Sequence, residues 1–364
     1  MPPRFFYNLG GLMHNIRVGV NVRFKNPPGF REPWDTVYRN NLAYAARADA
    51  LGFDGVWVPE HHCTEQGYDP TPLVALAALS QITKNCFLGT APLLLPLRNP
   101  VLTAEEVATV DVLSGGRMML GMGVGYLESD FDAIGIPRKE RGARMDEALQ
   151  IVCRALWNEG PFDFEGRFYK HKGVQLAPRP LQKNIRVELA VRSEAAAKRV
   201  ALPGINVNLN SLTVVQSVGP VVAEIASKAG RAPSSVGATI LFTGFLAENE
   251  DAGRKAVAQY NEEDAKQYLE YWSHSKDAVD RVLSAQYKEA SQTGVARGSF
   301  TPQSFVDGIH KAIETIAATG LRPDWINLNL WPSGMPFAQA LDCLERVAAD
   351  VLPKIPRNGG HAVE

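Results

Sequence analysis

Residues Ala50 to His62 read ALGFDGVWVPEHH, and this stretch is the most informative about the fold. It reads as the end of an amphipathic helix, a glycine turn and a short apolar strand, Gly55–Val58. Strands of parallel sheets are apolar throughout because both of their faces are buried. The strand brings Glu60, His61 and His62 to its carboxyl end. Catalytic groups of a (β/α)8 barrel lie at such strand ends, so this triplet is a candidate active site.

Strand-like and helix-like runs alternate along the whole chain. We expect strands at Ile16–Val22, Gly55–Val58, Cys86–Ala91, Arg117–Gly123, Arg186–Val191, Gly204–Leu209, Val236–Leu246 and Asp324–Leu330. We expect helices at Trp34–Ala50, Pro70–Ile82, Val101–Leu113, Arg141–Trp157, Ser193–Ala201, Leu212–Ala229, Glu250–Tyr271, Pro302–Ala318 and Pro336–Val351. Eight alternating strands favour a closed (β/α)8 TIM barrel over an open doubly wound sheet.

Two segments interrupt this alternation. Pro161–Lys172 has the alternating aromatic residues and glycine turn of an inserted β-hairpin. Trp272–Phe300 is polar and contains glycines, so it is either a lid over the barrel mouth or a surface excursion. We therefore expect an arm at residues 1–15, one barrel domain over 16–355 and a tail at 356–364.

The composition is that of an ordinary globular protein. Of 364 residues 45% are hydrophobic and 21% are charged, and the net charge is −1. Such a balance argues against a nucleic-acid or acidic-membrane surface. The first residues lack the apolar core of a signal peptide, and no apolar run is long enough for a transmembrane helix. The four cysteines are widely spaced, which predicts free thiols and a cytoplasmic location.

Three interpretations of Glu60, His61 and His62 follow from the residues alone. Adjacent histidines on a strand point to opposite sides, and no HExxH spacing or second ligand cluster is present, which argues against a metal. The histidines are then either structural or catalytic. Because the unperturbed pKa of histidine lies closest to neutrality, we expect one imidazole to transfer protons.

Three further motifs lie at strand ends. SGGRMMLGMGVG, residues 114–125, ends in glycines where backbone can approach a flat or phosphorylated ligand, and no helix is expected directly after Tyr126. Arg192 and Ser193 stand where a strand ends and a helix begins, an arrangement that suits either a plain helix cap or an anion site. Pro92 follows Ala91 at another strand end, although most such bonds are trans.

Taken together, these motifs resemble the bacterial luciferase-like flavin-dependent monooxygenases. The resemblance rests on EHH at residues 60–62, on GTAPLLLPLRNPVLTAEEVATVDVLSGGRMMLGMGVGY from Gly89 and on RSEAAAKRVALPG from Arg192. GSFTPQSF from Gly298 is similar to the family segment that begins the helix before the last strand. The match extends from about Ile16 to Val351.

The resemblance implies a dimeric (β/α)8 barrel that binds reduced FMN at its carboxyl mouth. It assigns catalysis to His61 with His62 as its neighbour, and places Glu60 under the isoalloxazine ring. The Ala91–Pro92 bond is often cis in the family, and Val124 replaces an arginine that contacts the phosphate in luciferase. The residues implied in cofactor binding are Glu60, Ala91, Pro92, Gly123, Val124, Gly125, Tyr126, Arg141, Val191, Arg192, Ser193, Asn208 and Asn210.

The implied activity is that of a two-component monooxygenase. A separate flavin reductase would supply reduced FMN, and dioxygen and a small organic substrate would be the other reactants. Arg141 or Arg192 would compensate for the arginine lost at Val124. Two alternatives remain: an oxidoreductase that uses the deazaflavin coenzyme, in which motifs like ERGARMDE at residues 140–147 also occur, and a non-catalytic flavin-binding protein.

Overall fold

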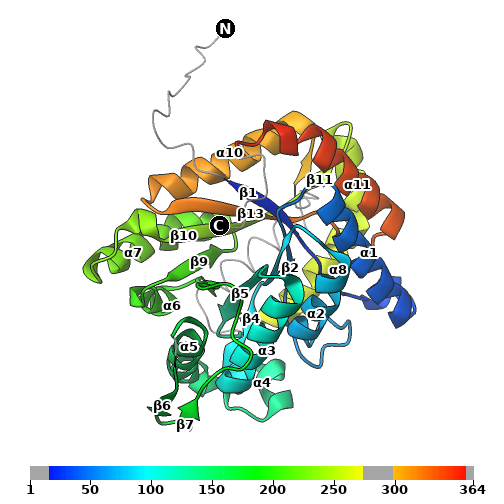
Figure 1. Cartoon of the computed structure of the whole chain (residues 1–364). Coiled ribbons are helices and arrows are strands. Elements are labelled where there is room, and N and C mark those ends of the chain that lie inside the picture. Colours follow the sequence, from blue (N-terminus) through cyan, green and yellow to red (C-terminus); the bar gives the residue numbers. More distant parts are fainter. Residues whose placement is uncertain (1–15, 159, 274–297, 358–364) are drawn as a thin grey trace.

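A computed structural model describes residues 16–158, 160–273 and 298–357. Eight strands, all parallel, form a closed barrel with helices outside it (Figure 1). They are β1 Arg17–Asn21, β2 Gly55–Val58, β3 Phe87–Thr90, β5 Met118–Gly123, β8 Arg186–Ala190, β9 Ile205–Leu209, β10 Gly237–Thr243 and β13 Arg322–Asn329. Pairing of β3 with β5 closes the ring, and the two-residue strand β4 (Leu93–Leu94) adds to β5. The predicted (β/α)8 barrel is confirmed.

The helices come from the amphipathic runs between the strands. They are α1 Trp34–Ala50, α2 Pro72–Ile82, α3 Pro100–Ser114, α4 Glu128–Ile134, α5 Arg141–Trp157, α6 Glu194–Ala197, α7 Leu212–Lys228, α8 Glu250–Ser273, α10 Pro302–Ala318 and α11 Phe337–Asp350. The sequence prediction missed α4, which begins at Glu128, only two residues after Tyr126. The expected helix Ser193–Ala201 is a four-residue α-helix followed by a 3-10 turn, Lys198–Ala201.

Side chains alternate between the two faces of each strand, as the period of a strand requires. On β1, Val18 and Val20 belong to the main hydrophobic core, whereas Gly19 and Asn21 occupy the alternate positions. The indole of Trp57 lies against Gly19, Gly55 and Gly89, where an added Cβ would come within 2.3–2.9 Å of the ring. The indole therefore takes space that side chains of three strands would otherwise fill.

Two insertions leave the barrel. Residues 162–165 (β6) and 170–174 (β7) form the expected antiparallel hairpin. The expected strand Val236–Leu246 is divided: β10 ends at Thr243, and β11 (Phe245–Leu246) pairs with β12 (Ser299–Phe300) in a separate sheet. Most of the candidate lid, residues 274–297, lies outside the described residues, as do the arm and most of the tail. In the part of the chain that is described, no helix has the length and apolar character to span a membrane.

Candidate active site

The centre of the site is the imidazole of His61, just beyond the carboxyl end of β2. Its Nδ1 lies 3.0 Å from Oδ2 of Asp130, and its Nε2 lies 3.3 Å from the hydroxyl of Tyr126. His61 and Asp130 are buried, and Tyr126 is half-buried. Because an ionised carboxylate only accepts hydrogen bonds, Nδ1–H donates to Asp130 and Nε2 is left as an acceptor. The imidazole is thus held in one tautomer, a condition for proton transfer at Nε2.

Asp130 reaches His61 because the chain turns sharply after β5. Gly125 has φ +74°, a conformation that favours glycine, and a Cβ there would lie 2.9 Å from the ring of Phe131. This turn leads into α4, and Asp130 stands in its first turn. The other carboxylate oxygen, Oδ1, accepts from the backbone N–H of His62 at 2.8 Å. One carboxylate therefore fixes both the side chain of His61 and the backbone beside it.

Glu60 is buried and already fully engaged. Its Oε2 accepts from the backbone N–H of Leu94 at 2.5 Å, and its Oε1 accepts from Arg98 at 2.9 Å. The Nε2 of His62 also lies 3.0 Å from Oε1. Glu60 therefore anchors the loop after β3 and the side chain of His62, an arrangement that suits positioning better than proton transfer.

The loop after His62 is folded tightly against the site. Tyr68 and Asp69 adopt φ +86° and +38°, and the ring of Tyr68 meets that of His61 edge-on at 4.8 Å. Lys25, in the segment after β1, lies 5.0 Å from the centre of the Tyr68 ring. Burial, aided by the negative charge of Glu60 and opposed by the N–H of Thr71, raises the pKa of Asp69 to about 6.

Gly123 and Pro92 lie against each other at the ends of β5 and β3. The Ala91–Pro92 bond is cis, as the family resemblance suggested, and a Cβ on Gly123 would lie 2.8 Å from Cγ of Pro92. A second cis bond, Ala177–Pro178, was not anticipated. Because Gly123 has no side chain, the backbones at the ends of β5 and β3 lie close together below the barrel mouth.

The residues assigned to a phosphate lie on neighbouring elements. The guanidinium of Arg192 lies 5.8 Å from the centre of the Tyr126 ring, and Ser193 Oγ accepts from the N–H of Ala196 at 3.3 Å. Arg199, in the 3-10 turn after Ser193, donates to the carbonyl of Gly142 at 3.0 Å. The start of α5, where Arg141 stands, therefore packs against the segment that follows Ser193.

Polar atoms without partners surround the mouth. Among the described residues, the buried carboxamide oxygens of Asn21, Asn210, Asn327 and Asn329 accept no hydrogen bond. Asn208 lies on β9, where its carbonyl accepts from the N–H of Val191 at 3.1 Å, and Val124 is half-buried beside Gly123. Because a buried polar atom without a partner is costly, these oxygens require a hydrogen-bond donor from a ligand or an ordered water.

The cysteines divide into two groups. All four are free, and Cys86, Cys153 and Cys343 are buried. Burial raises the pKa of Cys86 and Cys343 to about 12, so these thiols are poor nucleophiles. Cys63 is exposed beside His62.

The sequence prediction missed several residues of the site. Asp130, Arg98, Tyr68 and Lys25 all contact Glu60, His61 or each other in this cluster. For Asp130 a signal existed: an acidic residue in the first turn after a glycine-rich strand end is typical of a helix start. The other three can be found only from the packing.

Comparison with known proteins finds one family model and several relatives that match this chain. A family model described as luciferase-like monooxygenase matches residues 16–310. An F420-dependent glucose-6-phosphate dehydrogenase of Amycolatopsis mediterranei is 33% identical, over 46% of this chain and 51% of its own. The oxygenase component of the flavin-dependent trigonelline monooxygenase of Acinetobacter baylyi is 27% identical, over 48% of this chain and 49% of its own.

Among solved structures, the monooxygenase RslO1 of Streptomyces bottropensis superimposes with a TM-score of 0.76. It is 26% identical, and the alignment covers 93% of this chain and 99% of that one. The curated relatives, by contrast, match along about half of their length.

Proposed function

This chain belongs to the luciferase-like monooxygenase family, and we propose that it is a flavin-dependent monooxygenase that oxygenates a small organic substrate. The observation that carries the proposal is the buried imidazole of His61, oriented by Asp130 and capped by Tyr126, at the carboxyl end of a (β/α)8 barrel. A proton-transferring imidazole at that place suits oxidoreductase chemistry at a bound cofactor.

In this proposal the cofactor is reduced FMN, supplied by a separate reductase, and dioxygen is the second reactant. The flavin, when bound, supplies the electrons and the reaction with oxygen. The residues fit such a group because Asn210 presents a buried oxygen without a partner among the described residues. Arg192, Ser193 and Arg141 would hold the phosphate.

His61 has the main chemical role among the residues of this chain. Its Nε2, which faces the hydroxyl of Tyr126, would accept a proton from a ligand bound beside that hydroxyl, while Asp130 would stabilise the positive charge that then forms on the ring. Tyr68 packs edge-on against the imidazole and helps to shield it from water. His62, whose Nε2 lies 3.0 Å from Oε1 of Glu60, stays a second candidate for catalysis.

A second candidate is an oxidoreductase that uses the deazaflavin coenzyme F420. It is favoured by the similarity of this chain to the F420-dependent glucose-6-phosphate dehydrogenase of Amycolatopsis mediterranei, which is 33% identical. The same imidazole would then serve proton transfer without oxygen.

We also propose that the chain forms a homodimer through α2 and α3, which pack against each other. Apolar side chains on both helices are exposed, among them Val74 at 68% and Leu102 at 57%. The sequence of α2, PLVALAALSQI, is apolar nearly all round, which is typical of a helix covered on both sides. A second copy of the chain would cover this face as an isologous interface.

One experiment separates these candidates. The purified chain is titrated without oxygen with reduced FMN and, separately, with reduced F420, and oxygen is then admitted with a panel of ketones, aldehydes and aromatics. Binding of reduced FMN and oxygen-dependent product support the monooxygenase. Binding of F420 with oxygen-independent turnover of a substrate supports the second candidate. Flavin binding with no product for any panel member, and equal results for His61→Ala, identify a non-catalytic flavin-binding protein.

A further inference from the structure

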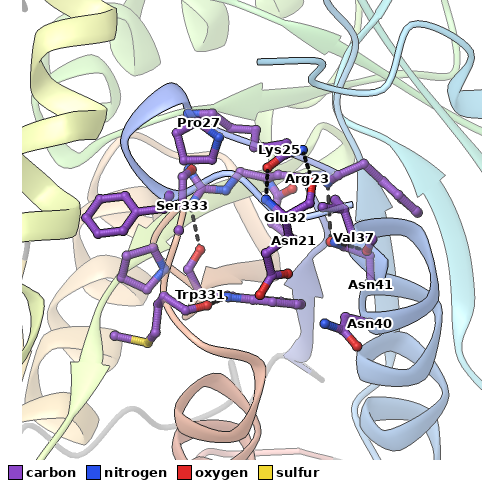
Figure 2. Close-up of a pocket in the computed structure, with 16 residues that line it drawn as sticks. Asn21, Arg23, Lys25, Pro27, Glu32, Val37, Asn40, Asn41, Trp331 and Ser333 are labelled. Carbon is purple, nitrogen blue, oxygen red and sulfur yellow. Dashed lines mark hydrogen bonds between the residues drawn. The ribbon is translucent and has the colours of Figure 1, made fainter. Parts of the chain in front are cut away.

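A polar hollow opens between the ends of β1 and β13, beside the candidate active site. It lies between the segment after β1, helix α1 and the loop after β13, where about 520 Å³ is free of protein atoms, open solvent included. Figure 2 shows Asn21 between the loop that carries Trp331 and Ser333 and the helix that carries Val37 and Asn41. A second hollow of about 240 Å³, between β10, β13 and α8, shares Arg23 and Pro332 with the first. We call the two together the β1–β13 hollow.

The floor of this hollow carries hydrogen-bonding groups that are not used. Val20 pairs with Leu328, so Asn21 and Asn329 come next on two neighbouring strands. Both are more than nine-tenths buried, as is Ser333. Within the described residues, Oδ1 of both asparagines and Oγ of Ser333 have no hydrogen-bond partner, nor has Nδ2 of Asn261 on α8. Asn21 and Ser333 line the first part of the hollow, and Asn329 and Asn261 line the second, so each part has a group that can accept and a group that can donate.

The charges on the wall are balanced. Arg23 donates to Asp264 at 3.3 Å and to the carbonyl of Trp331 at 2.5 Å, and Lys25 donates to Asp264 at 2.7 Å. Glu32 also lines the hollow, so two basic and two acidic side chains are present. An anionic ligand would have to compete with Asp264 for Arg23 and Lys25. A cationic ligand would be repelled by the same two side chains. The balance favours a neutral ligand.

Hydroxyl groups suit this lining best. A hydroxyl donates one hydrogen bond and accepts others, as a site with free carboxamide oxygens, a free serine hydroxyl and a free amide N–H requires. We propose that the β1–β13 hollow binds the organic substrate and selects a neutral, hydroxyl-bearing molecule. The proposal rests on the proposed function only in taking the ligand to be the substrate.

The hollow is linked to the candidate catalytic histidine by direct packing. Lys25 lines the hollow and lies over Tyr68, and Tyr68 packs against His61. A molecule seated against Lys25 would therefore be separated from the imidazole by two side chains, those of Lys25 and Tyr68. This distance is suitable for a substrate whose far end extends toward the barrel mouth.

The test compares three probes built on the same six-membered ring: 1,3-cyclohexanediol, its dimethyl ether and cyclohexanecarboxylate. Saturation-transfer NMR titrations measure their binding to the full chain without flavin. We expect the diol to bind more tightly than the other two, by about tenfold for each hydrogen bond that they cannot make. Asn21→Leu and Asn329→Leu should each remove about tenfold of that selectivity, because leucine has a similar size and no polar atom. Asn40→Leu, at the half-buried rim of the same hollow, is the matched control and should leave the selectivity unchanged.

Two further measurements on the leucine variants, thermal unfolding and affinity for reduced FMN, also test the proposal. Thermal unfolding of the two leucine variants should occur at or above the wild-type temperature, because they replace a buried carboxamide whose oxygen has no partner with an apolar group of similar shape. Their affinity for reduced FMN should be unchanged. A lower unfolding temperature would make the asparagines structural, and a loss of FMN binding would assign them to the cofactor. Either result overturns the proposal.

Failure of the inference and of the proposed function can be told apart. If the wild-type chain shows no saturable binding of the diol, or binds the ether or the carboxylate as tightly, the hollow holds only water and the inference is wrong. If the diol selectivity is found but no oxygenation can be detected, the inference about the ligand stands and the monooxygenase proposal falls.

Discussion

His61 and Asp130 are 69 residues apart in the chain, yet Nδ1 of the imidazole lies 3.0 Å from a carboxylate oxygen. The contact depends on the turn at Gly125 and on the short helix α4. Because Asp130 also accepts from the backbone N–H of His62, the geometry of the EHH segment is set from outside the segment.

The first prediction concerns this pair. His61→Ala should lower turnover by about 10²–10⁴-fold, the usual contribution of a general acid–base group, with flavin affinity largely kept. Asp130→Asn should lower turnover by about 10²-fold, because the amide donates to Nδ1 and moves the imidazole proton to Nε2. Stopped-flow turnover and flavin titration measure the two effects. Wild-type turnover in His61→Ala would remove the imidazole from the mechanism.

A second prediction concerns the dependence of stability on pH. Asp69 has a pKa of about 6 in the folded chain against 3.8 as its ordinary value, so folding takes up a proton between about pH 4 and pH 6. The free energy of unfolding therefore falls as the pH rises through that range, by as much as about 3 kcal/mol. Asp69→Asn removes this loss, so the stability of the variant relative to wild type should rise from pH 4 to pH 7.

Urea unfolding at each pH measures that difference. Asp132→Asn, an exposed carboxylate on α4, is the control and should show a constant difference from wild type. A constant difference for Asp69→Asn as well would mean that the buried carboxyl group does not titrate in this range.

Much of the fold is predictable from the sequence, because long apolar and amphipathic runs determine it. The strands at Gly55–Val58 and Arg186–Val191 follow from local patterns alone. Helix α4 does not, because seven residues give too little periodicity to outweigh the glycines before it. The paired positions of Asn21 and Asn329 depend on which strands become neighbours. Sequence periodicity places each asparagine on a strand face but does not pair the strands.

A third prediction addresses the proposed phosphate site. Reduced FMN should bind about 10- to 100-fold more tightly than reduced riboflavin, since charge-assisted hydrogen bonds contribute about 1.5–3 kcal/mol each. Arg192→Met keeps a side chain against Tyr126 but removes the charge, so it should weaken FMN binding and leave riboflavin binding unchanged. Fluorescence titration under nitrogen measures both. Equal affinities in the wild type would show that the phosphate lies free in solvent.

The fourth prediction tests the proposed dimer. Val74→Asp combined with Leu102→Asp places two carboxylates on the exposed apolar face of α2 and α3 and should give a monomer in sedimentation velocity. Circular dichroism should be unchanged, since both side chains are exposed. Ile134→Asp, an exposed apolar residue on α4, should leave the dimer intact. A wild-type chain that sediments as a monomer would contradict the proposal.

The indole of Trp57, in contact with three glycines, constrains how this barrel can change over evolutionary time. An alanine at Gly89 would bring its Cβ within 2.8 Å of the ring, so that substitution is not accepted while the indole is present; at Gly19 the Cβ would lie 2.3 Å from both the ring and the carbonyl oxygen of Gly55. A smaller residue at position 57, in turn, leaves a void that the glycines cannot fill. The residues at these positions therefore depend on one another. A single substitution at any of them gives a protein of lower stability. Lineages that share this tryptophan should keep the glycines with it as one inherited unit.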